Sequence, residues 1–181
     1  MERQLIPNPD PATGDPPIGD PAAGRGRLRR ADATDVAAVL RLREVMFAGM
    51  RGPSEEPVWS AATADWFRSG LGGDPAAFAA FVVDEPDRGV VSVAVGRTVP
   101  WMPSPRNPAG LRGHVFNVAT DENRRRLGYA RRCMAALLGW FSADTLVDRV
   151  DLHASAEGLS LYRSLGFELP REQALQLAIR R

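Results

Sequence analysis

The sequence predicts one domain of mixed α and β structure, an α/β class of the α+β kind. Segments with apolar residues at every third or fourth position, typical of amphipathic helices, are interleaved with short Val- and Phe-rich runs typical of strands. The chain has 181 residues, of which 44% are hydrophobic, so it can build one core and would hardly fit two domains. The predicted order is strand, two helices, hairpin, strand, helix, strand, short helix and closing strands.

An N-terminal tail is predicted to precede the domain. Residues 1–26 contain six prolines and four glycines and almost no large apolar residues. Ordering such a segment would bury too little surface to offset the entropy lost. We therefore expect residues 1–26 to be a disordered Pro/Gly-rich tail and residues 27–181 to form the single domain.

The composition limits where the protein is expected to be located and which partners it is expected to bind. Met1–Asp10 lacks the apolar stretch of a signal peptide, and the apolar stretch Met134–Ala143 is too short to cross a bilayer, so we expect a cytoplasmic protein without a membrane partner. A single cysteine, Cys133, fits a reducing compartment. A net charge of +1 gives no global attraction for nucleic acid. Two histidines far apart and scattered carboxylates predict no metal site.

The first third of the domain is predicted to be a short strand and two helices. Arg27–Arg30 fits a strand, and either Asp32 or Thr34 can cap the helix that follows and runs to about Gly49–Pro53. Ser60–Ser69 fits a second helix. Its Trp66 and Phe67 are expected to face inward, whereas Trp59, in the linker before this helix, could line a pocket.

The middle of the chain is predicted to be a hairpin and a further strand. Phe78–Val83 and Val90–Val99 read as two strands joined by a turn at Asp84–Gly89. The proline-rich loop Pro100–Gly113 is either a wall of a binding site or a plain connector. His114–Thr120 is expected to form the next strand.

Apolar spacing then predicts the best-defined helix, from Leu127 to about Phe141. A strand at Val150–Leu152 and a short helix at Gly158–Leu165 follow. Closing strands are expected at Phe167 and Gln173–Ile179.

The turn before the Leu127 helix has the features of a phosphate site. The free N–H groups at a helix start favour an anion, and Gly128 and Ala130 leave room for close backbone approach. Arg124–Arg126 lie where the helix dipole disfavours cations, so a negative group should offset them. No Ser, Thr, Asp or Asn stands at positions 124–127 to cap the helix, although Asp121 or Asn123 could do so if it starts early. A solvated basic turn and a nucleic-acid patch are the alternatives.

Two segments resemble the coenzyme A motifs of the GCN5-related N-acetyltransferases (GNAT). Arg125, Gly128 and Ala130 match the family pattern of Arg or Gln, two residues, Gly, one residue, then Gly or Ala. About thirty residues later, the ending Leu-Tyr-x-x-Leu-Gly-Phe of Leu161–Phe167 resembles the last coenzyme-site helix and the strand after it. The sequence departs from the pattern at Glu122, where many relatives have proline, and at Ser155, where many have asparagine.

The resemblance implies a mostly antiparallel central sheet, flanked by helices and splayed between strands 4 and 5 to admit acetyl-CoA. It implies that main-chain groups of Val118 and Thr120 pair with the pantetheine arm. The implied coenzyme site also contains Arg125, Arg126, Leu127, Gly128, Tyr129, Ala130 and Ser155.

An acetyltransferase needs a proton donor for the leaving thiolate and a way to deprotonate the amine. Tyr162 is the candidate general acid, with a core tyrosine as the alternative. His114 is the tentative base, since imidazole titrates in the useful range. Glu55 and Glu56 could attract an amine or form a solvated pair, and His153 is interpreted as structural. Cys133 lies among apolar neighbours without an activating partner, which disfavours an acyl-cysteine route.

The predicted function is therefore transfer of an acetyl group from acetyl-CoA to a primary amine of a small molecule, by direct attack in a ternary complex. The alternatives are a non-catalytic acyl-CoA sensor or scaffold of the same fold, or an acetyltransferase for protein N-termini or lysines. The acceptor is not readable from the sequence, because the loops Gly49–Ser60 and Pro100–Gly113 would set it. A homodimer is possible because the family often forms one.

Overall fold

A computed structural model describes residues 26–51, 60–170, 175 and 177–179. It contains a five-stranded sheet in the order β1-β2-β3-β4-β5. The strands β1 to β4 pair antiparallel with one another, and β5 runs parallel to β4. The strands are β1 (Arg27–Arg30), β2 (Phe78–Glu85), β3 (Gly89–Pro100), β4 (Leu111–Thr120) and β5 (Val150–Leu152). The predicted mixed class with a mostly antiparallel sheet is confirmed.

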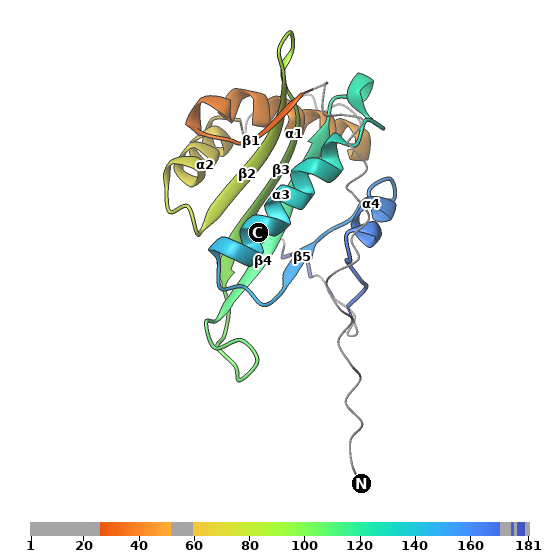
Figure 1. The fold of residues 1–181 in the computed structure, drawn as a ribbon. Helices are drawn as coiled ribbons and strands as arrows, with labels where there is room; N and C mark the ends of the chain where they lie inside the picture. The colour runs from red at the N-terminus through yellow and green to blue at the C-terminus, as the bar shows by residue number, and fades with distance from the viewer. Residues whose placement is uncertain (1–25, 52–59, 171–174, 176, 180–181) are drawn as a thin grey trace, which may run out of the picture.

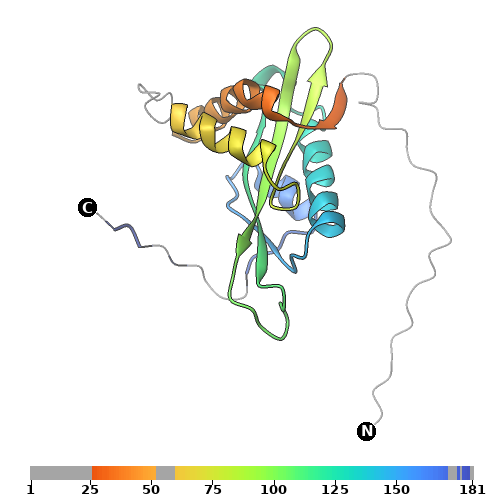
Figure 2. The same ribbon diagram turned by 90° about the vertical axis from the view of Figure 1, so that its left-hand side faces the viewer.

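Helices cover both faces of this sheet. α1 (Val36–Arg51) and α2 (Ser60–Gly72) lie on one face, and α3 (Tyr129–Asp144) crosses the other (Figures 1 and 2). The short helix α4 (Leu159–Ser164) follows β5. Each face has its own apolar core, because alternate residues of β2 and β3 point to opposite sides. Ala79 and Ala94 pack with α3, whereas Ala80 and Val93 pack on the side of α1 and α2.

A cluster of hydrogen bonds and ion pairs fixes the start of α1. Asp32 accepts the Thr34 N–H at 2.8 Å, and Asp35 accepts the Asp32 N–H at 2.9 Å, a capping box around a short 3₁₀ turn, Ala33–Asp35. The Arg29 guanidinium holds both Asp35 oxygens at 2.7 Å and also contacts Asp84 of β2 at 3.0 Å. Asp32, one of the two predicted caps, is therefore the one used.

A β-bulge in β4 sets the direction of the strand's open edge. Val115 pairs with Gly96 and Asn117 pairs with Val95, so Phe116 is an extra residue without a partner in β3. The bulge reverses the alternation of side chains: Val115 packs in the α3 core, while Ala119, four residues later, packs in the opposite core. The bulge therefore also changes which residues of β4 direct their backbone N–H and C=O groups toward β3.

The sheet opens between β4 and β5. These strands pair only from Gly113 to Val115 of β4, opposite Val150 to Leu152, and the remaining half of β4 has no strand on that side among the described residues. The predicted splay between the fourth and fifth strands agrees with this short pairing.

Some boundaries and one side-chain orientation differ from the sequence prediction. β4 begins at Leu111 rather than His114, because residues 111–113 pair with Thr98–Pro100 and Gly113 also donates its N–H to the Arg149 carbonyl. α3 begins at Tyr129 rather than Leu127, because the turn before it has positive φ angles at Arg126 and Gly128. In α2, Phe67 is buried as expected, whereas Trp66 is 41% exposed, so the inward prediction was wrong for Trp66.

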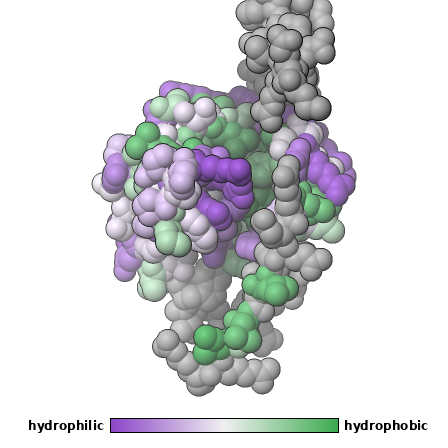
Figure 3. Space-filling model, turned by 90° about the horizontal axis from the view of Figure 1, so that it is seen from below, coloured by the Kyte–Doolittle hydropathy of each residue, from purple (hydrophilic) through white to green (hydrophobic). Residues whose placement is uncertain are grey.

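The closing strands are not confirmed. Phe167 donates its N–H to the Tyr162 carbonyl at 3.1 Å and so completes α4 instead of pairing in the sheet. No strand is formed by residues 167–170, 175 or 177–179, and the rest of Gln173–Ile179 lies outside the described residues. Pro170 cannot donate to a ladder, and β5 offers only three residues for pairing. Apolar side chains remain exposed at this end, including Leu175 and Leu177. In Figure 3 apolar residues are green.

The predicted tail (residues 1–26) lies outside the described residues except for Gly26, and Trp59, Glu55 and Glu56 lie outside them as well. In the part of the chain that is described, no helix is long and apolar enough to cross a membrane.

Candidate functional site

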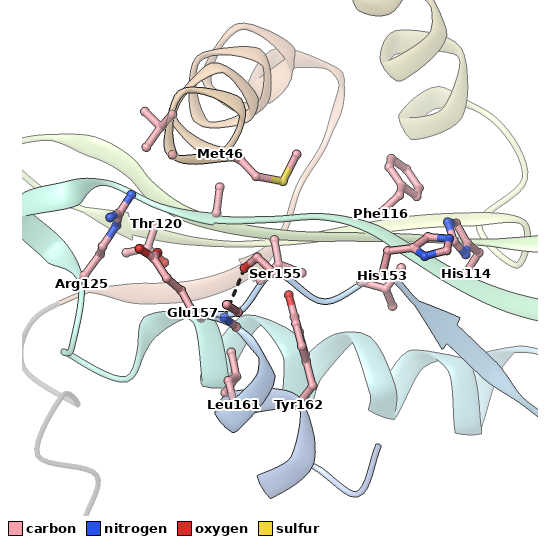
Figure 4. A pocket seen from close by; sticks show the side chains of 18 residues that line it. Met46, His114, Phe116, Thr120, Arg125, His153, Ser155, Glu157, Leu161 and Tyr162 are labelled. Atoms are coloured by element: carbon pink, nitrogen blue, oxygen red, sulfur yellow. Dashed lines mark hydrogen bonds between the residues drawn. The ribbon is translucent and has the colours of Figure 1, made fainter. Parts of the chain in front are cut away.

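A cleft of about 730 Å³ lies where β4 and β5 separate. One wall is the free half of β4, and the other is formed by residues 153–162 between β5 and α4. Arg125 and Thr120 lie at one end, His114 and His153 lie at the other, and Tyr162 stands between them (Figure 4). Met46 reaches the cleft from α1 on the opposite side of the sheet.

The β4 wall presents backbone groups. The Asp121 N–H donates to the Val91 carbonyl of β3 at 2.9 Å, and Ser92 of β3 contacts the Ala119 carbonyl at 3.1 Å. Because successive residues of a strand direct their N–H and C=O groups to opposite edges, Val118 and Thr120 direct theirs away from β3 and into the gap. Both residues line the cleft. The bulge at Phe116 produces this orientation, since Gly113, before it, directs its N–H to the carbonyl of Arg149, the residue just before β5.

The start of α3 is open. Gly128, its N-cap, has φ +79° and no capping side-chain hydrogen bond. Within the described residues, the N–H groups of Leu127, Gly128 and Ala130 have no backbone acceptor. Arg126 has φ +64°, a left-handed conformation that costs about 1–3 kcal/mol for a residue other than glycine. Unpaired N–H groups, helix dipole and positive-φ residues together form a concave site suited to an anion.

The three arginines of this turn have different roles, which corrects the expectation that one anion offsets all of them. Arg124 donates to Glu85 at 2.9 Å, and the same carboxylate accepts the buried Tyr129 hydroxyl at 2.7 Å. These contacts hold the pKa of Glu85 below its usual range against the effect of burial. Arg124 is therefore neutralised by the protein itself. Arg125 lines the cleft beside Thr120, and Arg126 is exposed.

Tyr162 extends from α4 with its hydroxyl directed toward β4 (Figure 4). Its ring packs edge-on against Phe167 at 6.0 Å and against Gly158, where an added Cβ would approach the ring to 2.8 Å. Among the described residues, no hydrogen-bond partner holds the hydroxyl. Burial raises the pKa of the phenol above its ordinary value of 10, so Tyr162 stays protonated at neutral pH. The side chain combines a fixed ring with a free proton donor.

Ser155 lies in the cleft wall but is used locally. Its hydroxyl oxygen accepts the Gly158 N–H at 3.2 Å and so shapes the turn into α4 (Figure 4). Glu157, beside it, is exposed and also lines the cleft. Ser155 therefore helps to position the start of α4.

The two histidines meet at the far end of the cleft. Their ring centroids are 6.0 Å apart, and the His114 ring stacks on Phe116 at 6.3 Å. Burial, followed by the charge of His153, lowers the pKa of His114, so this imidazole is neutral and able to accept a proton at neutral pH. His153, interpreted as structural from the sequence, is exposed and lines the same end.

Cys133 is fully buried in the α3 core, and burial raises the pKa of its thiol to about 12. A thiol so far from ionisation is a poor nucleophile, in agreement with the sequence prediction. No group of three or more potential metal ligands occurs among the described residues.

The sequence matches the family model described as "Acetyltransferase (GNAT) family" over residues 38–167. This match covers both walls of the cleft, the turn before α3 and Tyr162. The chain belongs to the GNAT acetyltransferase family. A comparison with curated protein sequences finds no match.

Solved GNAT structures share the fold of this GNAT chain. A GCN5-related N-acetyltransferase from Ralstonia eutropha is 22% identical, with 84% of this chain and 98% of that chain covered and a TM-score of 0.67. A predicted acetyltransferase with acetyl-CoA from Clostridium acetobutylicum is 20% identical, with coverages of 84% and 96% and a TM-score of 0.73. An aminoglycoside acetyltransferase from an uncultured soil metagenomic sample is 17% identical, with coverages of 88% and 99% and a TM-score of 0.64.

Sequence reasoning missed several cleft residues. Met46 has the helical spacing of a core residue, and nothing in the sequence marks it as facing a cleft. Phe116 belongs to a strand pattern that hides the bulge. The loop Pro100–Gly113, expected to shape a binding site or only to connect, does not line the cleft in the described structure. Its buried Asn107 instead bonds the Leu111 backbone at 2.9 and 3.3 Å.

Proposed function

We propose that this GNAT chain transfers the acetyl group of acetyl-CoA to a primary amine of a small molecule by direct attack in a ternary complex. The observation that carries the proposal is the position of the Tyr162 hydroxyl. Among the described residues this proton donor has no hydrogen-bond partner, and it lies between an open helix start suited to pyrophosphate and a pair of histidines.

Residues on the β4 and α3 side would hold the coenzyme. The N–H groups from Arg126 to Ala130 are suited to the pyrophosphate, with Arg125 as a charged partner. The free backbone groups of Val118 and Thr120 are suited to the amide groups of the pantetheine arm, which would extend the sheet edge by one strand-like segment. These contacts would bring the thioester toward Tyr162.

The reaction then needs two proton transfers. The neutral amine attacks the thioester carbonyl carbon, a C–N bond forms, and the C–S bond breaks. The amine gives a proton to His114, and the departing thiolate takes the hydroxyl proton of Tyr162, which is regained from solvent. The buried thiol of Cys133 takes no part, since no acyl-enzyme is formed.

Calorimetry with acetyl-CoA, followed by a thiol-release assay over a panel of primary amines, tests the proposal. We expect binding in the micromolar range and amine-dependent release of free CoA. Arg125→Gln should weaken binding about tenfold through loss of a charge-assisted contact. Arg106→Gln, which removes the same charge from the exposed loop of residues 101–110, should leave binding unchanged. Absence of acetyl-CoA binding by the folded protein would refute the proposal, and binding without turnover of any amine would reduce it to acyl-CoA binding.

A further inference from the structure

We infer that the acceptor amine carries an anionic group close to its nitrogen, and that Arg97 of β3 binds this group. The inference rests on the proposed function and names its substrate class: amino acids and similar anionic amines, in place of polycationic ones. It follows from the charges that surround the histidine end of the cleft.

Arg97 lies next to the candidate base. It is the direct cross-strand partner of His114, so both side chains project from the same face of the sheet. Burial is the main cause of the lowered pKa of His114; the charge of His153 and, more weakly, that of Arg97 also lower this pKa, while the charge of Asp151 opposes them. An anion bound to Arg97 would therefore lie near the nitrogen that His114 deprotonates.

Aromatic rings hold the arginine in place without neutralising it. The Arg97 guanidinium carbon lies 5.8 Å from the Trp66 ring centroid, and the Trp66 ring contacts Phe116 at 5.3 Å. Phe116 in turn stacks on His114 and lines the cleft. The hydrogen bond of Arg97 goes to a backbone oxygen, that of Thr98, at 3.4 Å. Trp66, which is 41% exposed, is left partly uncovered at this surface.

The carboxylates described near this end of the cleft are not paired with Arg97. Asp151, which faces His114 from β5, lies 3.9 Å from Arg112, and Arg112 also stacks on Trp101 at 4.1 Å. Glu157 lies on the opposite wall, beside Ser155. In the described residues, Arg97 forms no ion pair with a carboxylate. Its guanidinium charge is therefore available to an anion from outside the protein.

The guanidinium of Arg97 would select among amines. A guanidinium binds a carboxylate through two parallel N–H···O contacts, which fixes the position of the amine as well as adding affinity. The same charge opposes a second ammonium group on the substrate. Phe116, Met46 and Val45 add apolar surface at the cleft, so an apolar body on the acceptor fits better than a sugar chain.

A matched substrate set tests the inference on the wild-type protein. L-phenylalanine, its carboxamide and phenethylamine share one apolar body and differ in the anionic group. We expect kcat/KM, expressed per deprotonated amine, to be about tenfold to a hundredfold higher for phenylalanine than for either analogue. Spermidine should be the poorest acceptor. Phosphoethanolamine compared with ethanolamine shows whether a phosphate can replace the carboxylate.

Variants of Arg97 assign the effect to this side chain. Arg97→Gln should abolish the preference for phenylalanine mainly by raising its KM, with little change for phenethylamine. Arg97→Glu should reverse the preference in favour of spermidine. Arg68→Gln, which removes one exposed charge from α2, is the matched control and should change neither ratio. An unchanged acetyl-CoA affinity verifies that each variant is folded.

The outcomes separate this inference from the proposed function. Turnover of amines without a preference for the anionic partner, or with spermidine as the best acceptor, overturns the inference alone. A preference that persists in Arg97→Gln also overturns it. If acetyl-CoA binds and no amine at all is acetylated, the proposed function fails and this inference fails with it.

Discussion

The two tyrosines of this chain have opposite environments. The Tyr129 hydroxyl is buried and donates to Glu85 at 2.7 Å, while the Tyr162 hydroxyl faces the cleft without a partner among the described residues. A hydroxyl bonded inside the core contributes to stability, and an unbonded one in a cleft is free to react. Removing each hydroxyl in turn therefore compares a tyrosine that stabilises the fold with one that is proposed to act in the reaction.

Tyr162→Phe should lower kcat about 100-fold with little change in stability or in acetyl-CoA affinity, because only a proton donor is removed. Tyr129→Phe should do the reverse: a loss of about 1–3 kcal/mol in the free energy of unfolding and near-normal kcat. Steady-state kinetics and urea unfolding measure the two effects. Equal kcat values in wild type and Tyr162→Phe across the pH range would show that the phenol is not the acid.

His114 should control the fall of kcat/KM at acid pH. Burial disfavours the imidazolium form, so its pKa lies below the ordinary value of 6.5 and the base is available at neutral pH. We expect kcat/KM, corrected for the fraction of deprotonated amine, to be flat near neutral pH and to fall only below 6.5. In His114→Gln the limb should disappear and the plateau should drop about 100-fold. A limb that survives this substitution belongs to another group.

At the scale of elements, two local distortions create the site: the bulge in β4 and the left-handed turn before α3. The bulge directs the backbone of Val118 and Thr120 into the gap. Within the described part of the chain, the turn leaves the N–H groups of Leu127, Gly128 and Ala130 without a backbone acceptor, with Gly128 at φ +79°. Bulges and left-handed backbone both occur preferentially at functional sites.

The turn is tested by a pair of glycine substitutions in the same region. An added Cβ would meet nothing within 4 Å at either Gly128 or Gly139, so only backbone conformation distinguishes the two sites. Gly128→Ala should cost about 1–2 kcal/mol through its positive φ and weaken acetyl-CoA binding several-fold. Gly139→Ala, inside α3, should gain up to about 1 kcal/mol and leave binding unchanged. Thermal unfolding and calorimetry report both, and similar affinities in the two variants would argue against the turn as the anion site.

At the scale of the whole molecule, the Arg29–Asp35–Asp84 cluster joins β1, β2 and the entry to α1. The Arg29 guanidinium holds the pKa of Asp35 below its ordinary value despite burial. The unfolded carboxyl titrates near 3.9, so this cluster contributes its full stability above about pH 4 and loses it as the pH falls through the lower, folded pKa.

Asp35→Asn should lower the free energy of unfolding by about 2–4 kcal/mol at pH 7, because Arg29 loses its main partner. The difference from wild type should shrink in acid, where the wild-type carboxyl is also neutral. Urea unfolding at a series of pH values measures this. Asp65→Asn is the control, since its exposed pair with Arg68 should contribute less than about 1 kcal/mol. A pH-independent difference would assign the loss to packing rather than to charge.

Most elements of this fold were predictable from the sequence because their signals are local. Helical spacing located α1 and α3, alternating or Val-rich runs located β2 and β3, and Asp32 marked the start of α1. The open turn before α3 and the α4 segment with Tyr162 were also predictable, since each depends on a few neighbouring residues.

The sequence alone determined which residues could do chemistry and which backbone could bind an anion. Only the tertiary structure decided that Glu85 neutralises Arg124 across 39 positions of the chain, that Phe116 forms a bulge, and that Arg97 lies opposite His114. The physical reason is that helix, turn and cap preferences arise between residues close along the chain. Ion pairs, register and the direction of an open strand edge depend on which distant segments pack together, and no local pattern records that choice.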